Sequence, residues 1–203
     1  MEAHQQIETT FDEQQSLQVI KEMVQVSRKK LKNDGILFIL WGWIGFISYF
    51  LEYLTQTVPH TYQFSIFKSY TTVILPIAGI ILTVIYLIRK SRKVSTYIGI
   101  ALRYVWVGMF VGMVLINLIQ ANVLHGIPFE LQLPIFMVLI AFALVVTGGL
   151  LRYKMIIAGG VVFGLLAYLA SFFSFNTQLL IDSIAWMIAF IIPGHILYAK
   201  RNV

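Results

Sequence analysis

The sequence predicts an all-α polytopic membrane protein with six transmembrane helices, preceded by a cytoplasmic amphipathic helix. Hydrophobic residues make up 59% of the 203 residues and charged residues only 12%, about half the charged share of a soluble domain. The apolar residues gather in six runs without strand-like alternation. Inside lipid such runs must be helices, because every backbone polar group needs an internal partner.

The first 34 residues precede the apolar runs. Residues 1–10 are polar, and we expect them to be disordered. Residues 11–34 are predicted to form an amphipathic juxtamembrane helix. Its apolar positions recur at helical spacing: Leu17, Ile20, Val24 and Leu31. The favoured interpretation is a helix on the inner membrane surface, with its basic second half near anionic headgroups. The alternative is a docking helix that binds a protein partner through residues 11–32, because an apolar residue recurs there every seven positions.

The six apolar runs that follow form one transmembrane domain, residues 35–199. A helix needs about 20 residues to cross a hydrocarbon core of about 30 Å. The runs cover residues 35–54, 71–88, 97–119, 133–151, 155–173 and 179–199. Residues 200–203 are predicted to be a short cytoplasmic tail.

The orientation follows from the basic residues. With the amino terminus inside, the inner segments hold fourteen of the 15 Lys and Arg residues, and the outer loops hold only Lys68. Basic residues concentrate in the cytoplasmic loops of membrane proteins. The distribution therefore predicts a bacterial inner-membrane protein with both termini in the cytoplasm. The polar, acidic start predicts that no signal peptide is cleaved.

Small residues and prolines indicate how the helices pack. Gly108 and Gly112, and likewise Gly160 and Gly164, are spaced four residues apart, which places both glycines of a pair on one helix face. Such faces let membrane helices approach closely. Packing within the chain is the favoured interpretation, and a seam between two copies in a homo-oligomer is the alternative. Pro193 is predicted to kink the last helix.

Ionisable residues at membrane depth are candidate functional groups. On the predicted outer side they are Glu52, His125, Glu130 and Asp182. Such a cluster could relay protons or bind a divalent cation. The favoured alternative is that these acids simply end helices at the outer interface, because no metal-ligand spacing such as HExxH accompanies them. On the inner side the candidate pair is Arg103 and His195.

Several function classes are disfavoured by the residues. No GxSG nucleophile or HExxH motif occurs, and the chain has no cysteine, so the sequence predicts neither an enzyme nor a cofactor or metal site. The net charge of +6 lies in short loops and forms no continuous basic face, so nucleic acid is not an expected partner.

Several segments resemble an uncharacterised family of small bacterial inner-membrane proteins common in the Bacteroidetes. They are LQVIKEMVQVSRKKL, GILFILWGWIGF, TGGLLRYKMIIAGGVVFG and AFIIPGHILYAKR. Members of this family are often encoded beside winged-helix transcription regulators. The resemblance implies a role in regulation and supplies no catalytic residues. Where its members often carry an aromatic residue after Pro-Gly, this chain has His195.

Two hypotheses for the function follow. The first is a regulatory or partner-binding membrane component, favoured by the amphipathic helix and the absence of a catalytic motif. The second is a small transporter or channel for a proton-coupled or cationic solute, favoured by the outer acidic residues and the kinked helices.

Overall fold

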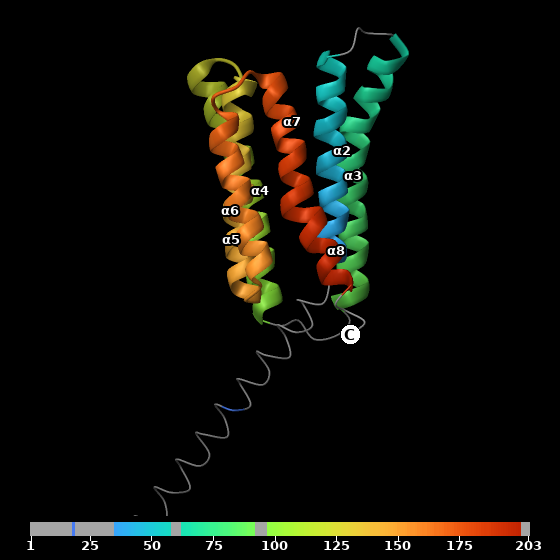
Figure 1. The fold of residues 1–203 in the computed structure, drawn as a ribbon, viewed down its shortest axis with the longest axis vertical. Helices are drawn as coiled ribbons and strands as arrows, with labels where there is room; N and C mark the ends of the chain where they lie inside the picture. Colours follow the sequence, from blue (N-terminus) through green and yellow to red (C-terminus); the bar gives the residue numbers. More distant parts are fainter. Residues whose placement is uncertain (1–17, 19–34, 58–61, 92–96, 200–203) are drawn as a thin grey trace, which may run out of the picture.

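We describe the fold from a computed structural model, which covers Gln18 and residues 35–57, 62–91 and 97–199. All regular secondary structure in this part of the chain is helical (Figure 1), which confirms the all-α class. The elements are α2 (Ile36–Thr57), α3 (Tyr62–Ser91), α4 (Tyr97–Leu124), α5 (Phe129–Leu151), α6 (Lys154–Ala170), α7 (Phe175–Trp186), the π-helical turn η1 (Met187–Ile191) and α8 (Ile192–Ala199). The predictions for residues 1–10, for the helix at 11–34 apart from Gln18, and for residues 200–203 lie outside the described residues.

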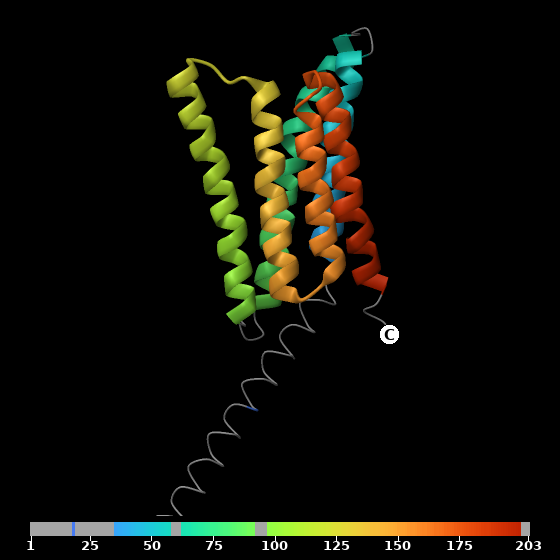
Figure 2. The ribbon, with the colours of Figure 1, turned by 60° about the vertical axis from the view of Figure 1, so that its left-hand side comes forward.

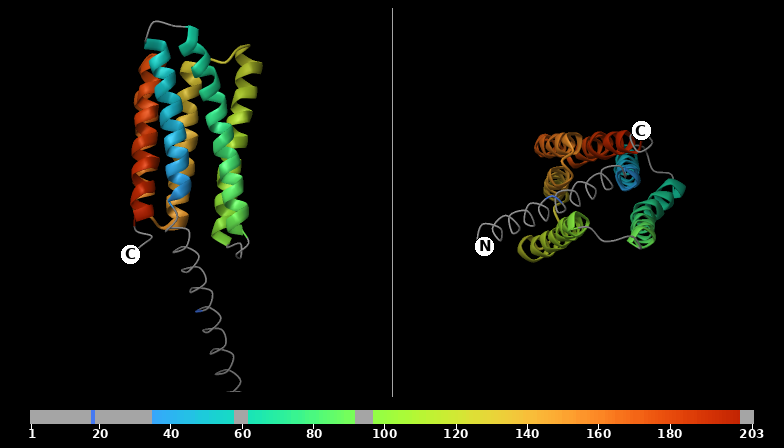
Figure 3. Two further views of the ribbon diagram at one scale, coloured as in Figure 1. Left: turned by 90° about the vertical axis from the view of Figure 1, so that its right-hand side faces the viewer. Right: turned by 90° about the horizontal axis from the view of Figure 1, so that it is seen from below.

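The helices form six roughly parallel rods, because α7, η1 and α8 continue one another (Figures 1 and 2). Each predicted apolar run lies along one rod, although the helix bounds differ. The fourth run was expected to begin at residue 133, whereas α5 begins at Phe129 behind Pro128. The backbone hydrogen bonds continue into interfacial residues that an apolar pattern does not mark. The start of α2 and the end of α8 lie at the same end of the bundle (Figure 3).

Four helices in the described part of the chain are long and apolar enough to cross a membrane. They are Ile36–Thr57, Ile98–Leu124, Phe129–Leu151 and Phe175–Ala199. The two other predicted spans correspond to shorter apolar helical stretches, Ile74–Tyr86 within α3 and Lys154–Ala170. At a rise of about 1.5 Å per residue, the 17 residues of α6 reach about 26 Å. The structure thus supports a helical membrane protein with four long candidate spans.

The outer surfaces of α3 and α4 are strongly apolar. On α3, for example, Ile77, Ile81 and Ile88 are at least half exposed, and on α4 Val107 and Leu118 are similarly exposed. The packing contacts of α3 run mainly to α2, and those of α4 mainly to α5. Apolar surface of this extent is unfavourable in water and is expected of helices that face lipid.

Glycines set the close approach of the central helices. A Cβ atom added to Gly160 would lie 2.9 Å from the Val145 backbone nitrogen, and one added to Gly42 would lie 2.9 Å from Phe190 Cβ. These glycines therefore bring α6 onto α5 and α2 onto η1. Gly108 on α4 has no atom within 4 Å of such a Cβ position. Gly160 therefore packs within the chain, as predicted. Gly108 contacts no other helix, so this position on α4 is not covered by the described part of the chain.

The last rod changes its winding at η1. Pro193 has no N–H to donate to the carbonyl group of Ala189, and its ring would crowd that group in a regular α-helix. The π-helical turn Met187–Ile191 accommodates this locally. A kink is predicted at Pro193; the structure shows a π-helical turn just before the proline. It lies directly after Trp186, a residue of the candidate site described next.

Candidate functional site

A cavity of about 420 Å³ lies between α2, α3, α5 and α7. We call it the aromatic cavity, because six of its fourteen lining residues are aromatic. The aromatic residues are Trp41, Tyr49, Phe129, Phe136, Phe175 and Trp186. The polar lining residues are Ser48, Glu52 and Gln132, and none of the described lining residues is basic. The volume falls within the range of about 300–1,000 Å³ typical of small-molecule sites.

One face of α2 forms the long wall of the cavity. Trp41, Gly45, Ser48 and Glu52 all line it, and their spacing of three or four residues keeps them on the same side of the helix. At about 1.5 Å per residue, the wall from Trp41 to Glu52 is about 16 Å long. The cavity therefore has an aromatic group at one end of this wall and a carboxylate near the other.

The absence of a side chain at Gly45 on α2 lets the Trp186 indole of α7 pack closely against the α2 backbone. A Cβ atom at position 45 would lie 2.2 Å from Cδ2 of the Trp186 indole, so the ring rests on bare backbone. The Trp186 ring also stacks against Phe190 and Tyr49, with centroid distances of 4.4 and 6.5 Å. These contacts fix the indole, which is only 8% exposed, in a single position beside the cavity.

Asp182 lies directly behind this wall. Its side chain is 1% exposed, and its Oδ1 atom has no hydrogen-bond partner among the described residues. The Tyr49 side chain lies within electrostatic range of the carboxyl group. The Trp186 indole N–H lies toward the Asp182 carboxyl group, but Nε1 does not reach hydrogen-bond geometry. A buried carboxyl group thus adjoins two cavity residues without being fully paired.

Other buried polar atoms on α2 and α7 share this property. Ser48 Oγ, Gln178 Oε1 and Trp186 Nε1 are buried and have no hydrogen-bond partner within the described part of the chain. Buried polar groups in native proteins are nearly always paired with protein, water or ligand. Their concentration on α2 and α7 indicates a place where a ligand or ordered water supplies the missing partners.

Two other cavity residues are held by hydrogen bonds to neighbouring helices. Trp41 Nε1 donates to Thr83 Oγ1 on α3 at 3.0 Å. Gln132 Nε2 donates to Asn117 Oδ1 on α4, and Asn117 in turn donates to the Met113 carbonyl oxygen at 3.2 Å. These bonds orient cavity residues from α2 and α5 through the peripheral helices α3 and α4.

The four predicted outer residues separate into two pairs. Glu52 lines the aromatic cavity, and Asp182 lies behind it. His125 and Glu130 are exposed and do not line it. His125 has a φ of 52°, in the left-handed region, directly after the end of α4, so it ends this helix. Among the described residues no group of three or more His, Cys, Asp or Glu side chains could hold a metal ion.

The two predicted inner residues are not brought together. Arg103 on α4 and His195 on α8 are both exposed. The two helices stand on opposite sides of the bundle (Figures 2 and 3). The sequence places both residues near the inner end but gives no helix order around the bundle.

Several cavity residues had no signal of their own in the sequence. Ser48, Tyr49 and Trp186 are ordinary residues of apolar runs. Their joint spacing held a partial signal, because Gly45 and Tyr49 share one helix face with Glu52, and Asp182 shares one with Trp186. Only the packing of α2 on α7 joins the two faces.

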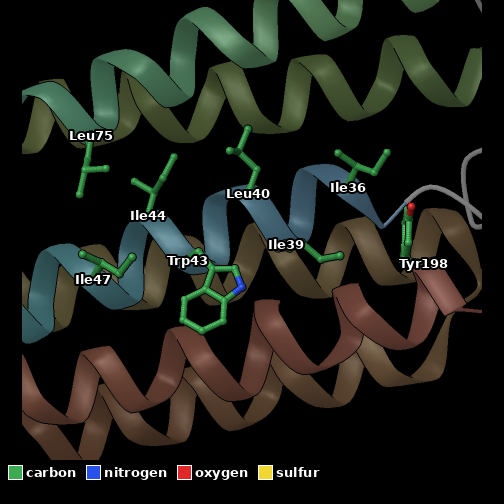
Figure 4. Close-up of a pocket in the computed structure, with 8 residues that line it drawn as sticks. All are labelled: Ile36, Ile39, Leu40, Trp43, Ile44, Ile47, Leu75 and Tyr198. Atoms are coloured by element: carbon green, nitrogen blue, oxygen red, sulfur yellow. The ribbon is translucent and has the colours of Figure 1, made fainter.

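A second hollow is an apolar groove of about 440 Å³ along the other side of α2. Figure 4 shows Leu75 of α3 near one end and Tyr198 of α8 at the other, with α2 side chains such as Leu40 and Trp43 between them. Apart from the hydroxyl group of Tyr198 and the indole N–H of Trp43, the lining side chains are hydrocarbon. The groove resembles the lipid-facing surface around it and offers no chemical group for catalysis.

No family model, curated protein or solved structure matches the chain. The resemblance to the Bacteroidetes membrane family therefore stays a prediction. The chemistry of the aromatic cavity is inferred from its own residues.

Proposed function

We propose that this protein is a small six-span transporter, rather than an enzyme, that takes a cationic solute into the aromatic cavity. The observation that carries the proposal is the buried, incompletely paired carboxyl group of Asp182 beside a cavity that also contains Glu52. A carboxyl group is costly at membrane depth and is retained mainly where it binds an ion or substrate or relays a proton.

The position of the cavity fits this function. Asp182 is the eighth residue of α7, about 10 Å along the helix from Phe175. Glu52 lies five residues before the end of α2, at the same end of the bundle. By the distribution of basic residues this is the outer end. A cation arriving from outside would meet Glu52 first and the Asp182 region next.

Transport can be tested in proteoliposomes made from phosphatidylethanolamine and phosphatidylglycerol. The probes are Na⁺, K⁺, methylammonium, 4-phenylbutylammonium and an imposed proton gradient, with flux or current as the measurement. We expect at least one cation to move in the wild type and its flux to be lost in Asp182→Asn and reduced in Glu52→Gln. Glu130→Gln is the matched control, because Glu130 is exposed and outside the cavity lining. Wild-type flux equal to that of empty liposomes for every probe would refute the proposal.

The proposed orientation has a direct test, because the chain contains no cysteine. A single cysteine at His125 should react with a membrane-impermeant maleimide in intact spheroplasts. One at Lys154, the exposed first residue of α6, should react only after the membrane is opened. The reverse pattern would mean that the aromatic cavity faces the cytoplasm.

The regulatory hypothesis stays a separate prediction. Its binding segment, residues 11–32, lies outside the described residues except for Gln18. Deleting that segment should abolish a specific complex while leaving membrane insertion intact, and an unchanged set of co-purifying proteins would contradict it.

A further inference from the structure

We infer that the ligand of the aromatic cavity is an elongated hydrophobic organic cation, with an ammonium head near Glu52 and an apolar body toward Trp41. This inference rests on the proposed function and narrows it to one class of solute.

The lining chemistry distinguishes this class from inorganic cations. A bare metal cation needs several oxygen ligands at short range; Ca²⁺, for example, takes six to eight. The side chains of Ser48, Gln132 and Tyr49 supply one oxygen atom each, spread over α2 and α5, and Glu52 supplies the only carboxylate among the described lining residues. An alkylammonium group needs fewer oxygen ligands, because aromatic faces attract it as well. Six aromatic residues in one cavity supply such faces.

The shape of the cavity sets the form of the ligand. Its α2 wall extends about 16 Å from Trp41 to Glu52. Glu52 is the only ionisable carboxylate among the described lining residues, and it lies near one end of this wall. The remainder of the lining is mainly aromatic or aliphatic, with Leu133, Phe136 and Leu179 among its members. A molecule charged at one end and apolar along its length matches this distribution.

Unpaired buried polar atoms at the cavity wall also point to a ligand. Trp186 is 8% exposed and lines the cavity, yet its Nε1–H donor has no hydrogen-bond partner in the described part of the chain. Ser48 Oγ, from the facing helix, is also buried and unpaired there. A ligand with a polar group along its body, or a water molecule bound beside it, would satisfy both atoms.

The test is ligand binding to the full-length protein in lipid nanodiscs, followed by tryptophan fluorescence and calorimetry. The probes are 4-phenylbutylammonium, its uncharged analogue 4-phenyl-1-butanol, methylammonium and K⁺, each also titrated into empty nanodiscs. We expect saturable binding of 4-phenylbutylammonium that is at least about tenfold tighter than that of the other three probes.

Variants locate the binding to this cavity. Glu52→Gln should weaken the binding of 4-phenylbutylammonium about tenfold and leave that of the alcohol unchanged. Phe136→Leu should weaken the binding of both, since it removes an aromatic face and retains an apolar side chain. Trp43→Phe is the control, because Trp43 lies in the apolar groove on the other side of α2 (Figure 4). A circular dichroism spectrum and a melting curve for each variant separate lost binding from lost folding.

The outcomes distinguish the inference from the function on which it rests. Equal binding of the ammonium and the alcohol would overturn the cation specificity. Binding of K⁺ or methylammonium without 4-phenylbutylammonium would overturn the inference and leave cation transport standing. No binding of any probe, together with no flux in proteoliposomes, would overturn both.

Discussion

Asp182→Leu should make the protein more stable and abolish its cation flux in proteoliposomes. The Asp182 side chain is 1% exposed, and its Oδ1 atom has no hydrogen-bond partner among the described residues. Leucine has the same number of side-chain heavy atoms and the same branching, and its methyl groups are larger than the carboxyl oxygens, so the substitution leaves no new cavity.

The magnitude follows from the burial. Leaving a buried polar group unsatisfied costs about 1–3 kcal/mol, and a leucine at this site carries no such group. We therefore expect the free energy of unfolding to rise by about 1–3 kcal/mol. For a chain of this size each 1 kcal/mol corresponds to roughly 2–4 °C in melting temperature. A rise in the free energy of unfolding when a functional group is removed is the usual trade-off between stability and activity.

The assay is equilibrium unfolding by sodium dodecyl sulfate in mixed micelles, followed by circular dichroism, with a thermal melt as a second measurement. Ser183→Ala is the matched control. Ser183 is the neighbouring residue and equally buried, but its Oγ donates to the Leu180 carbonyl oxygen at 2.8 Å. Its loss should cost about 0.5–1.5 kcal/mol. A loss of more than about 1 kcal/mol in Asp182→Leu would refute the reasoning, because the carboxyl group would then be a structural element.

The remaining predictions concern the walls of the same cavity. Gly45→Ala should lower the free energy of unfolding by about 1–3 kcal/mol, because the new Cβ would lie 2.2 Å from the Trp186 ring. Gly108→Ala, with no atom within 4 Å, should be neutral or stabilise by up to about 1 kcal/mol, and comparable losses in both variants would contradict the packing. Thr83→Val should cost about 0.5–1.5 kcal/mol and change the tryptophan emission spectrum, because it removes the acceptor of the Trp41 Nε1–H. An unchanged spectrum would argue against that hydrogen bond.

The candidate site shows how far a sequence pattern extends. Glu52 and Asp182 are predicted as polar groups near one membrane face; Glu52 lines the aromatic cavity and Asp182 lies behind its wall. The sequence pattern also groups His125 and Glu130 with them and pairs Arg103 with His195. Hydropathy and charge place a residue at a depth along the membrane normal. They hold no information on which helix is the neighbour of which or on which face of a helix meets that neighbour. The helices of Arg103 and His195 are apart, and Glu130 lies on an exposed face of α5 although α5 itself lines the cavity.

The sequence by itself determined the helical class and the positions of the apolar runs between polar segments. Each run must satisfy its own backbone hydrogen bonds in lipid, which only a helix does within one segment. The tertiary structure alone decided that Gly45 receives Trp186, that α3 and α4 pack at the periphery, and that Asp182 lies unpaired beside an aromatic cavity. Those features depend on close contact between α2 and the later helices α5 and α7, and α7 begins more than a hundred positions after α2 ends. Helix packing in lipid is set by the fit of small and large side chains on facing surfaces, which no single run of the sequence contains.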